Sequence, residues 1–188
     1  IGNAMCAPGG KVLVFSGLYD PKKGLVRDEM ELAAVLGHEI AHATCRHTTE
    51  SMTRQAPVNA LLVIGALVAE AKGSDEAALA LGAGFLVYNG LWVTKYSRVD
   101  EAEADRVGLM YMAKAGYDPR AAPRLWKRVY EREGDDPSLF MLLSTHPYNK
   151  ARWKELEKHM PEALALYAQA TGKSLDALQG ELPPGRPF

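Results

Sequence analysis

The sequence predicts an α+β protein that is predominantly helical and carries one small antiparallel sheet. Three observations predict this class. Residues 2–6 and 11–16 are short apolar, β-branched or aromatic runs on either side of a Pro-Gly-Gly turn, as in a β-hairpin. From Asp28 onward the apolar residues recur at helical spacing. Between residues 57 and 93, two almost wholly apolar runs are separated by a short polar turn.

The composition is that of an ordinary globular chain of 188 residues, long enough for one domain with a core. The net charge is −1, so charge gives no reason to expect nucleic acid as a partner. Cys6 and Cys45 are too few for a disulfide-dense scaffold, and a single disulfide between them stays open. Because the chain begins with Ile1 rather than Met, we expect further residues upstream.

The best-defined helix is expected over residues 29–50. Asp28 can cap its first turn, with Glu31 three residues later as a capping-box partner. Apolar residues follow at helical intervals, which predicts that one face of this helix is buried.

This helix contains the pattern His-Glu-x-x-His at residues 38–42. Four residues advance about 400°, so His38 and His42 lie on one face, one turn apart. Two imidazoles so placed can bind one Zn²⁺ at about 2.0–2.1 Å each. Glu39 lies beside them and can act as the general base on a metal-bound water.

Residues 57–71 and 76–93 predict two apolar helices. We favour two buried core helices, because the first run is shorter than the about 20 residues of a membrane span and carries Glu70. The alternative is contact with a membrane surface through residues 57–93, since small residues such as Gly65 and Gly82 also suit close helix packing in lipid.

The rest of the chain predicts helices over residues 100–115, 123–133, 149–159 and 161–170. A frayed tail is expected at residues 183–187, where prolines cluster. Tyr96, Tyr117 and Tyr148 are given no functional role.

A catalytic zinc needs a third protein ligand and an open position for water. The candidates are His47, His146, His159 and the acidic stretch at residues 100–105. His47 would lie about 140° around the helix from His42 and should point away. Glu101 and Asp105 share a helix face, so one can bind metal while the other accepts a hydrogen bond from a ligand imidazole. An acidic helix start that only complements the helix dipole stays equally open.

The order of motifs resembles the M48 zinc metallopeptidases, which include the CaaX-prenyl endopeptidases and the heat-shock HtpX proteins. The motifs are Gly-His-Glu-x-x-His at residues 37–42, Glu-x-x-Ala-Asp-x-x-Gly at 101–108, Ala-Gly-Tyr-Asp-Pro at 115–119 and Ser-Thr-His-Pro at 144–147. The resemblance implies a zincin-like peptidase domain over residues 1–160, part of which lies upstream of this chain. A C-terminal helix and Pro-rich tail would follow over residues 161–188.

The resemblance also implies roles for individual residues. His38, His42 and Glu101 would bind one zinc ion per chain. Glu39 would be the general base, and Asp105 the carboxylate behind a ligand histidine.

Further roles that the resemblance implies concern a loop and a strand. His146 would stabilise the oxyanion, or fill the fourth zinc position in a self-inhibited state. Arg152 would anchor the same loop or the oxyanion. An extended peptide substrate would pair with the strand made by Asn3, Ala4, Met5 and Cys6.

The implied function is that of a zinc-dependent endopeptidase acting on peptides or unfolded proteins. The absence of a clear membrane span favours the soluble, bacterial envelope members of the family, with a periplasmic or membrane-associated location and a role in protein quality control. The alternative is a non-catalytic zinc-binding chaperone or sensor domain whose metal is closed by His146.

Overall fold

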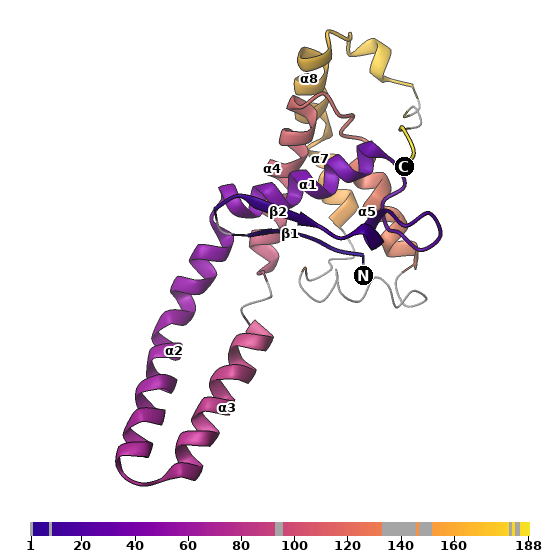
Figure 1. Ribbon diagram of the computed structural model, residues 1–188. Helices are drawn as coiled ribbons and strands as arrows, with labels where there is room; N and C mark the ends of the chain where they lie inside the picture. The colour runs from indigo at the N-terminus through magenta and orange to yellow at the C-terminus, as the bar shows by residue number, and fades with distance from the viewer. Residues whose placement is uncertain are drawn as a thin grey trace.

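The computed structural model describes residues 2–7, 9–92, 96–132, 146, 152–180, 182 and 185–188. A body of packed helices carries a two-stranded sheet on one side, and a long helical hairpin projects away from it (Figure 1). The elements are β1 (Ala4–Ala7), β2 (Lys11–Val14), the 3-10 turn η1 (Ser16–Tyr19), the helices α1 (Glu29–Thr44), α2 (His47–Ala71), α3 (Asp75–Trp92), α4 (Arg98–Lys114), α5 (Ala121–Arg132), α7 (Arg152–Lys158) and α8 (Met160–Thr171), and η3 (Asp176–Leu178). The predicted class, helical with a small antiparallel sheet, is confirmed.

The sheet is the predicted N-terminal hairpin. β1 and β2 pair antiparallel, with Ala4 opposite Val14 and Ala7 opposite Lys11. Gly9 and Gly10 make the turn with φ values of 91° and 80°, a region that favours glycine. β1 packs against α1, so the sheet borders the helix that carries the His-Glu-x-x-His pattern.

The start of α1 differs in one detail from the predicted capping box. The Asp28 side chain caps the helix by accepting from the Glu31 N–H at 2.9 Å. The Glu31 carboxylate, however, accepts from the Arg27 N–H and pairs with Arg124 and Arg128 of α5. The expected partner of the cap therefore joins α1 to α5, because two guanidinium groups attract the carboxylate more strongly than one amide.

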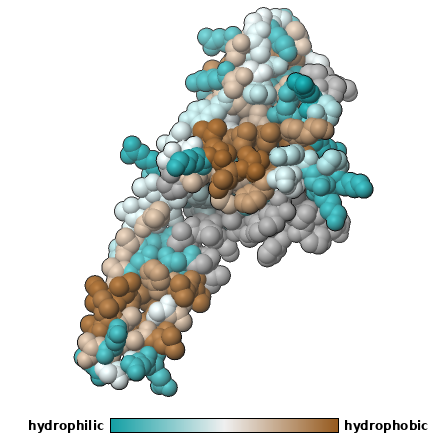
Figure 2. All heavy atoms as spheres, in the orientation of Figure 1, coloured by the Kyte–Doolittle hydropathy of each residue, from teal (hydrophilic) through white to brown (hydrophobic). Residues whose placement is uncertain are grey.

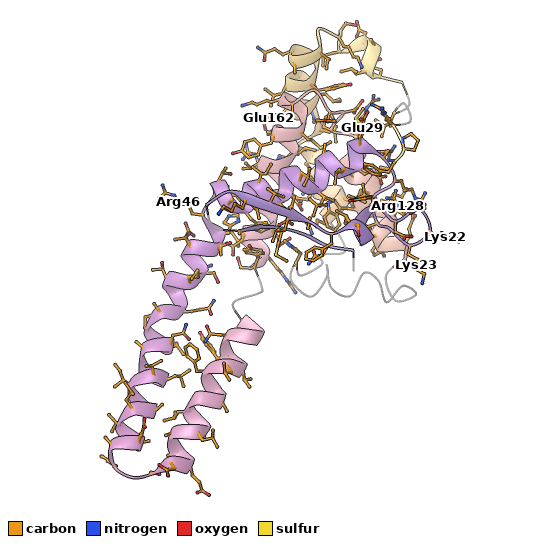
Figure 3. All side chains as sticks on the ribbon, in the orientation of Figure 1. Lys22, Lys23, Glu29, Arg46, Arg128 and Glu162 are labelled. Carbon is orange, nitrogen blue, oxygen red and sulfur yellow. The ribbon has the colours of Figure 1, made fainter. Side chains whose placement is uncertain are left out.

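The helix predicted over residues 29–50 ends six residues early. Arg46 has φ 62° and ψ 22°, a left-handed conformation that stops α1 at Thr44 and turns the chain into α2 (Figure 3). α2 then runs from His47 through Pro57, which lies inside this helix and not at its start. The boundary between the first and second helices therefore lies at residues 45–46, and His47 begins the second helix instead of continuing the first.

The hydrophobic core of the body is built by α1, α4, α5, α7 and α8. Fully or nearly fully buried side chains include Val35, Leu109, Leu125, Val129, Leu156 and Tyr167. α8 packs on α4, so the helix beyond residue 160 shares this core; the division into 1–160 and 161–188 stays a prediction. The described part of the tail is not frayed, because the Glu29 N–H donates to the Arg186 carbonyl and Phe188 packs on Tyr19.

The expectation that the two apolar helices are buried core helices is wrong. α2 and α3 pack on each other, and no described side chain between residues 56 and 92 belongs to the buried core. α2 is also long and apolar enough to cross a membrane, judged by length and composition alone. The sequence interpretation did not count this helix as a candidate span, because it began the helix at Pro57 and not at His47.

α1 and α4 approach each other closely at two glycines. A Cβ on Gly108 would lie 2.7 Å from the backbone of Gly37 and His38, and one on Gly37 would lie 2.6 Å from the Gly108 carbonyl oxygen. Any other residue would therefore force the two helix backbones apart. Because Glu101 and Gly108 are two turns apart on one face of α4, this contact sets the distance between Glu101 and the α1 histidines.

We predict that Gly108→Ala destabilises the protein by about 1–3 kcal/mol, because the new methyl group meets backbone that cannot move aside without shifting α4. Urea or thermal unfolding measures this. Gly82→Ala is the control, since Gly82 in α3 has nothing within 4 Å and should lose no stability. A Gly108→Ala protein as stable as the parent would contradict the close-contact account.

Candidate metal site

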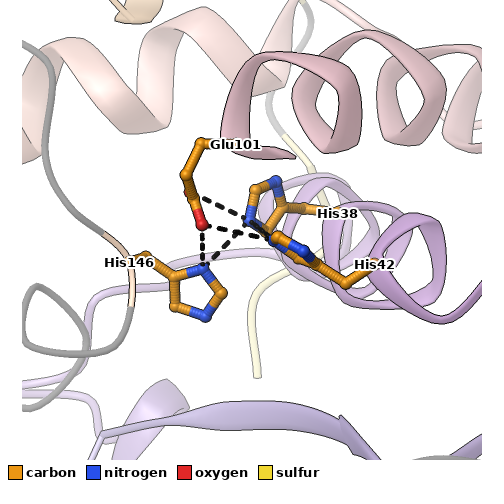
Figure 4. A group of neighbouring side chains, drawn as sticks. All are labelled: His38, His42, Glu101 and His146. Atoms are coloured by element: carbon orange, nitrogen blue, oxygen red, sulfur yellow. Dashed lines mark hydrogen bonds and ion pairs between the residues drawn. The ribbon is translucent and has the colours of Figure 1, made fainter. Parts of the chain in front are cut away.

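Four buried side chains from three parts of the chain converge on one point. α1 supplies His38 and His42, and α4 supplies Glu101. His146, which follows α5 in the sequence, completes the group. Figure 4 shows the three rings and the carboxylate facing a common centre.

The spacing of the donor atoms matches a four-coordinate metal site. His38 Nε2 lies 3.0 Å from His42 Nε2, 3.3 Å from His146 Nδ1 and 3.5 Å from Glu101 Oε2. Glu101 Oε1 lies 3.3 Å from His42 Nε2 and 2.9 Å from His146 Nδ1. Ligands at 2.0–2.1 Å from one ion in tetrahedral geometry stand about 3.3–3.4 Å apart. The cluster can therefore hold a metal ion with little rearrangement.

Buried oxygen atoms without hydrogen bonds also fit a cation here. Among the described side chains, Glu39 Oε1 and Glu101 Oε2 are buried and make no hydrogen bond; His146 Nε2 and Arg152 Nη1 are their respective neighbours at 3.3 Å. Leaving carboxylate oxygens without hydrogen bonds away from water is costly, and a cation reduces that cost. A donor set of imidazoles and one carboxylate suits divalent transition metals, zinc among them.

Asp105 and Arg152 lie behind His38. Asp105 Oδ1 is 3.0 Å from His38 Nδ1, so an N–H at this nitrogen can donate to the carboxylate while Nε2 faces the cluster. Arg152 donates to both oxygens of Asp105 and stacks on Trp126, with its Cζ 3.7 Å from the ring centroid. Its Nη1 lies 3.3 Å from Glu101 Oε2. Arg152, which is itself buried, thus contacts and helps to position two carboxylates.

His47 does not point away from His42, as the sequence predicted. The left-handed turn at Arg46 returns the chain, so His47 Nδ1 lies 2.9 Å from His42 Nδ1 and His47 Nε2 lies 3.3 Å from Glu103 Oε2. If His42 presents Nε2 to the cluster, its Nδ1–H donates to His47, whose own Nε2–H donates to Glu103. This chain of two hydrogen bonds holds the His42 ring as Asp105 holds His38.

Sequence reasoning missed His47 and Glu103 because it carried one helix through residue 46. The signal that could have found them is the end of regular apolar spacing after Ala43. Sequence reasoning also gave no role to Tyr96. Its ring stacks on His42 at a centroid distance of 3.8 Å, and its hydroxyl is hydrogen-bonded to the Thr48 hydroxyl.

The electrostatics of the metal-free cluster favour a proton on His38, a neutral His42 and an ionised Glu101. Burial lowers the pKa of His42 to about 3 despite the nearby Glu101. Burial and Arg152 also act to lower the pKa of His38, but hydrogen bonds to Asp105 and Glu101 outweigh them and raise it to about 9. Burial would raise the pKa of Glu101, yet hydrogen bonds to the three histidines hold it far below its ordinary value. A metal cation would take the place of the proton on His38.

Glu39 lies next to the cluster and is almost completely buried. Its Oε1 is 3.3 Å from His146 Nε2, while His146 Nδ1 faces the other ligands. The His146 ring therefore stands between Glu39 and the centre of the cluster. The remaining residues of the Ser-Thr-His-Pro motif, with Tyr148, lie outside the described residues.

The N-terminal strand borders the same region. The Asn3 carbonyl accepts from the Phe15 N–H, so in the alternation of an antiparallel pair the main-chain groups of Ala4 and Cys6 face the edge that no other described strand pairs with. Asn3 is buried and its Oδ1 accepts from the Ala4 N–H. Cys6 and His42 line a common cavity of about 270 Å³. Cys6 and Cys45 are both free.

Comparison with known proteins relates this chain to metallopeptidases. The sequence model of peptidase family M48 matches residues 1–160. The mitochondrial metalloendopeptidase OMA1 of Schizosaccharomyces pombe is 38% identical over 86% of this chain and 44% of its own length. The OMA1 of Arabidopsis thaliana is 38% identical over 89% of this chain and 32% of its length. The β-barrel assembly-enhancing protease of Escherichia coli K12 is 28% identical over 90% and 34%. The chain thus spans less than half the length of these relatives.

We predict that His47→Ala weakens Zn²⁺ binding about 10–100-fold, because the His42 ring loses the group that orients it. Competition with a chromogenic chelator measures the affinity, and far-UV circular dichroism checks the fold. His159→Ala is the matched control, since His159 lies at the start of α8 away from the cluster. Equal affinity in the His47 variant and the parent protein would disprove the orienting role.

Proposed function

This chain belongs to peptidase family M48, and from that membership we propose that it is a zinc-dependent endopeptidase. One observation carries the proposal: three buried imidazoles and one carboxylate face a common centre, and the buried carboxylate of Glu39 lies beside them. We propose His38, His42 and Glu101 as the zinc ligands, with one ion per chain.

Zinc bound here would polarise the scissile carbonyl and make a water molecule more acidic. Glu39 takes the proton of the attacking water and passes it to the leaving amine. Its burial beside the cluster keeps the carboxylate close to that water and away from bulk solvent. Asp105, held by Arg152, keeps the His38 ring oriented, and the contacts of Arg152 suit this anchoring role better than a contact with the oxyanion.

We propose that His146 closes the site in the described arrangement. Its Nδ1 occupies the fourth corner of the cluster, where a substrate carbonyl or a water would otherwise be placed. Hydrolysis then requires the ring to leave. The same contact favours the second candidate function, a non-catalytic zinc-binding chaperone or sensor whose metal His146 closes permanently.

The substrate would be an extended segment of a peptide or unfolded protein. The edge of β1 that no described strand pairs with offers the Ala4 carbonyl and the main-chain groups of Cys6, which can pair with such a segment by strand addition; the Ala4 N–H already donates to Asn3 Oδ1. Along the same strand, the side chains of Asn3 and Met5 point to one face of the sheet and those of Ala4 and Cys6 to the other. This places the peptide beside the cavity that His42 and Cys6 line.

The biological role that we propose is protein quality control at the bacterial cell envelope, in a periplasmic or membrane-associated location. One relative is named for enhancing β-barrel assembly in Escherichia coli, which supports this role. Other relatives, the OMA1 metalloendopeptidases, are mitochondrial by name.

We predict that Glu39→Gln retains zinc but lowers peptidase activity at least ~10²-fold, since the amide cannot take a proton. Casein hydrolysis by the zinc-loaded protein, with zinc content by elemental analysis, measures both properties. Glu29→Gln, at the start of the same helix, is the control. Full activity with unchanged zinc in the Glu39 variant would refute the base assignment.

The His146→Ala variant separates closure from catalysis. We predict weaker zinc binding but an activity per bound zinc at least equal to that of the parent, because the fourth corner is freed. A loss of activity per zinc would show instead that His146 stabilises the oxyanion. Stoichiometric zinc without turnover in both proteins would favour the chaperone or sensor function.

A further inference from the structure

The α2–α3 hairpin projects from the body and has no partner in the described chain. Its helices pack only on each other beyond residue 55, and the turn at residues 72–74 ends it far from the core (Figure 1). Leu61 and Leu79 are 72% and 75% exposed, and Leu86 is 72% exposed. The other exposed apolar side chains here are Val58, Val63, Ile64, Leu67, Val68 and Val87. Such a patch on a protein in water marks a contact surface.

The exposed apolar surface spreads around α2 and is not confined to one stripe. At 100° per residue, Leu61 and Val63 lie about 160° apart, and Ile64 and Leu67 fall between them. A protein partner seated in a groove would cover a narrower stripe. A wide apolar arc is what a helix surrounded by lipid presents. Apolar side chains also cluster at the hairpin end in Figure 2.

The contact between α2 and α3 is of the kind found between helices in lipid. Asn59 and Asn89 exchange two side-chain hydrogen bonds, at 2.9 and 3.2 Å. Gly65 lets Leu81 approach closely, 3.2 Å from where a Cβ would stand. Inter-helix amide pairs and small residues hold helices together where apolar burial gives no driving force.

Charge is absent from the middle of the hairpin. Residues 55–69 of α2 and 77–92 of α3 carry no charged side chain, which gives uncharged lengths of about 22 and 24 Å. Charged residues return at the base with Arg54 and at the tip with Glu70, Lys72, Asp75 and Glu76. A hydrocarbon layer about 30 Å thick can thin locally to match such a length, with the tip charges reaching the far headgroups.

We propose that the α2–α3 hairpin inserts into the hydrocarbon region of a lipid bilayer and holds the metal cluster at the membrane surface. α2 begins at His47, which contacts His42, and its uncharged part begins eight residues later, about 12 Å along the helix axis. The headgroup layer is about 5–8 Å thick on each side of a bilayer, so the cluster lies just above it, at the membrane surface. This inference rests on the proposed peptidase function. If the chain is a peptidase, its substrates reach the site at the membrane surface.

Flotation of the full chain with neutral phosphatidylcholine vesicles tests the proposal. We expect the protein to float with the vesicles equally well at low salt and at about 0.5 M NaCl, since apolar insertion is not screened. The double variant Leu61→Asp, Leu79→Asp should bind vesicles at least 10-fold more weakly. These side chains are exposed, so circular dichroism should show an intact fold.

The double variant Leu13→Asp, Leu175→Asp is the matched control, because both leucines are exposed outside the hairpin, and it should float like the parent. The proposal would be overturned if the hairpin variant floated as well as the control variant. It would also be overturned if the parent protein did not float, or stopped floating at high salt. A stable dimer that does not float and that the hairpin variant dissociates would overturn it as well, since the hairpin would then bind a second copy. Glu39→Gln should float normally, which separates this test from that of peptidase activity.

Discussion

The contact between Gly37 and Gly108 is the constraint on which the site depends. It brings the backbones of α1 and α4 closer than any side chain allows, and the cluster forms across this contact. His38 follows Gly37 directly, and Glu101 lies two turns before Gly108 on the same face of α4. The carboxylate thereby reaches both α1 imidazoles within 3.5 Å.

Buried charge is the second constraint. Glu39, Glu101, Asp105 and Arg152 are all removed from water within one small region, which costs free energy unless each has a partner. Asp105 accepts two hydrogen bonds from Arg152, whereas one oxygen each of Glu39 and Glu101, and Nη1 of Arg152, make no hydrogen bond. A divalent cation balances the excess of carboxylates, so the charge distribution and the donor geometry call for the same ligand.

Much of this site could be predicted from sequence, and the failures have physical reasons. The spacing of His38 and His42 and the shared face of Glu101 and Asp105 follow from helix geometry. The left-handed turn at Arg46 does not, because a non-glycine residue in that conformation carries no pattern of its own. The exposure of the apolar hairpin was misjudged because composition alone does not distinguish a protein interior from lipid.

X-ray absorption spectroscopy at the zinc edge tests the central claim most directly, because it counts and identifies the donor atoms. The described chain offers one other cluster that could hold a metal, formed by Cys45, His47 and Glu103. Our account predicts one zinc per chain with three nitrogen ligands and one oxygen ligand, at about 2.0–2.2 Å. A sulfur ligand at about 2.3 Å would place the metal at Cys45 and contradict the account.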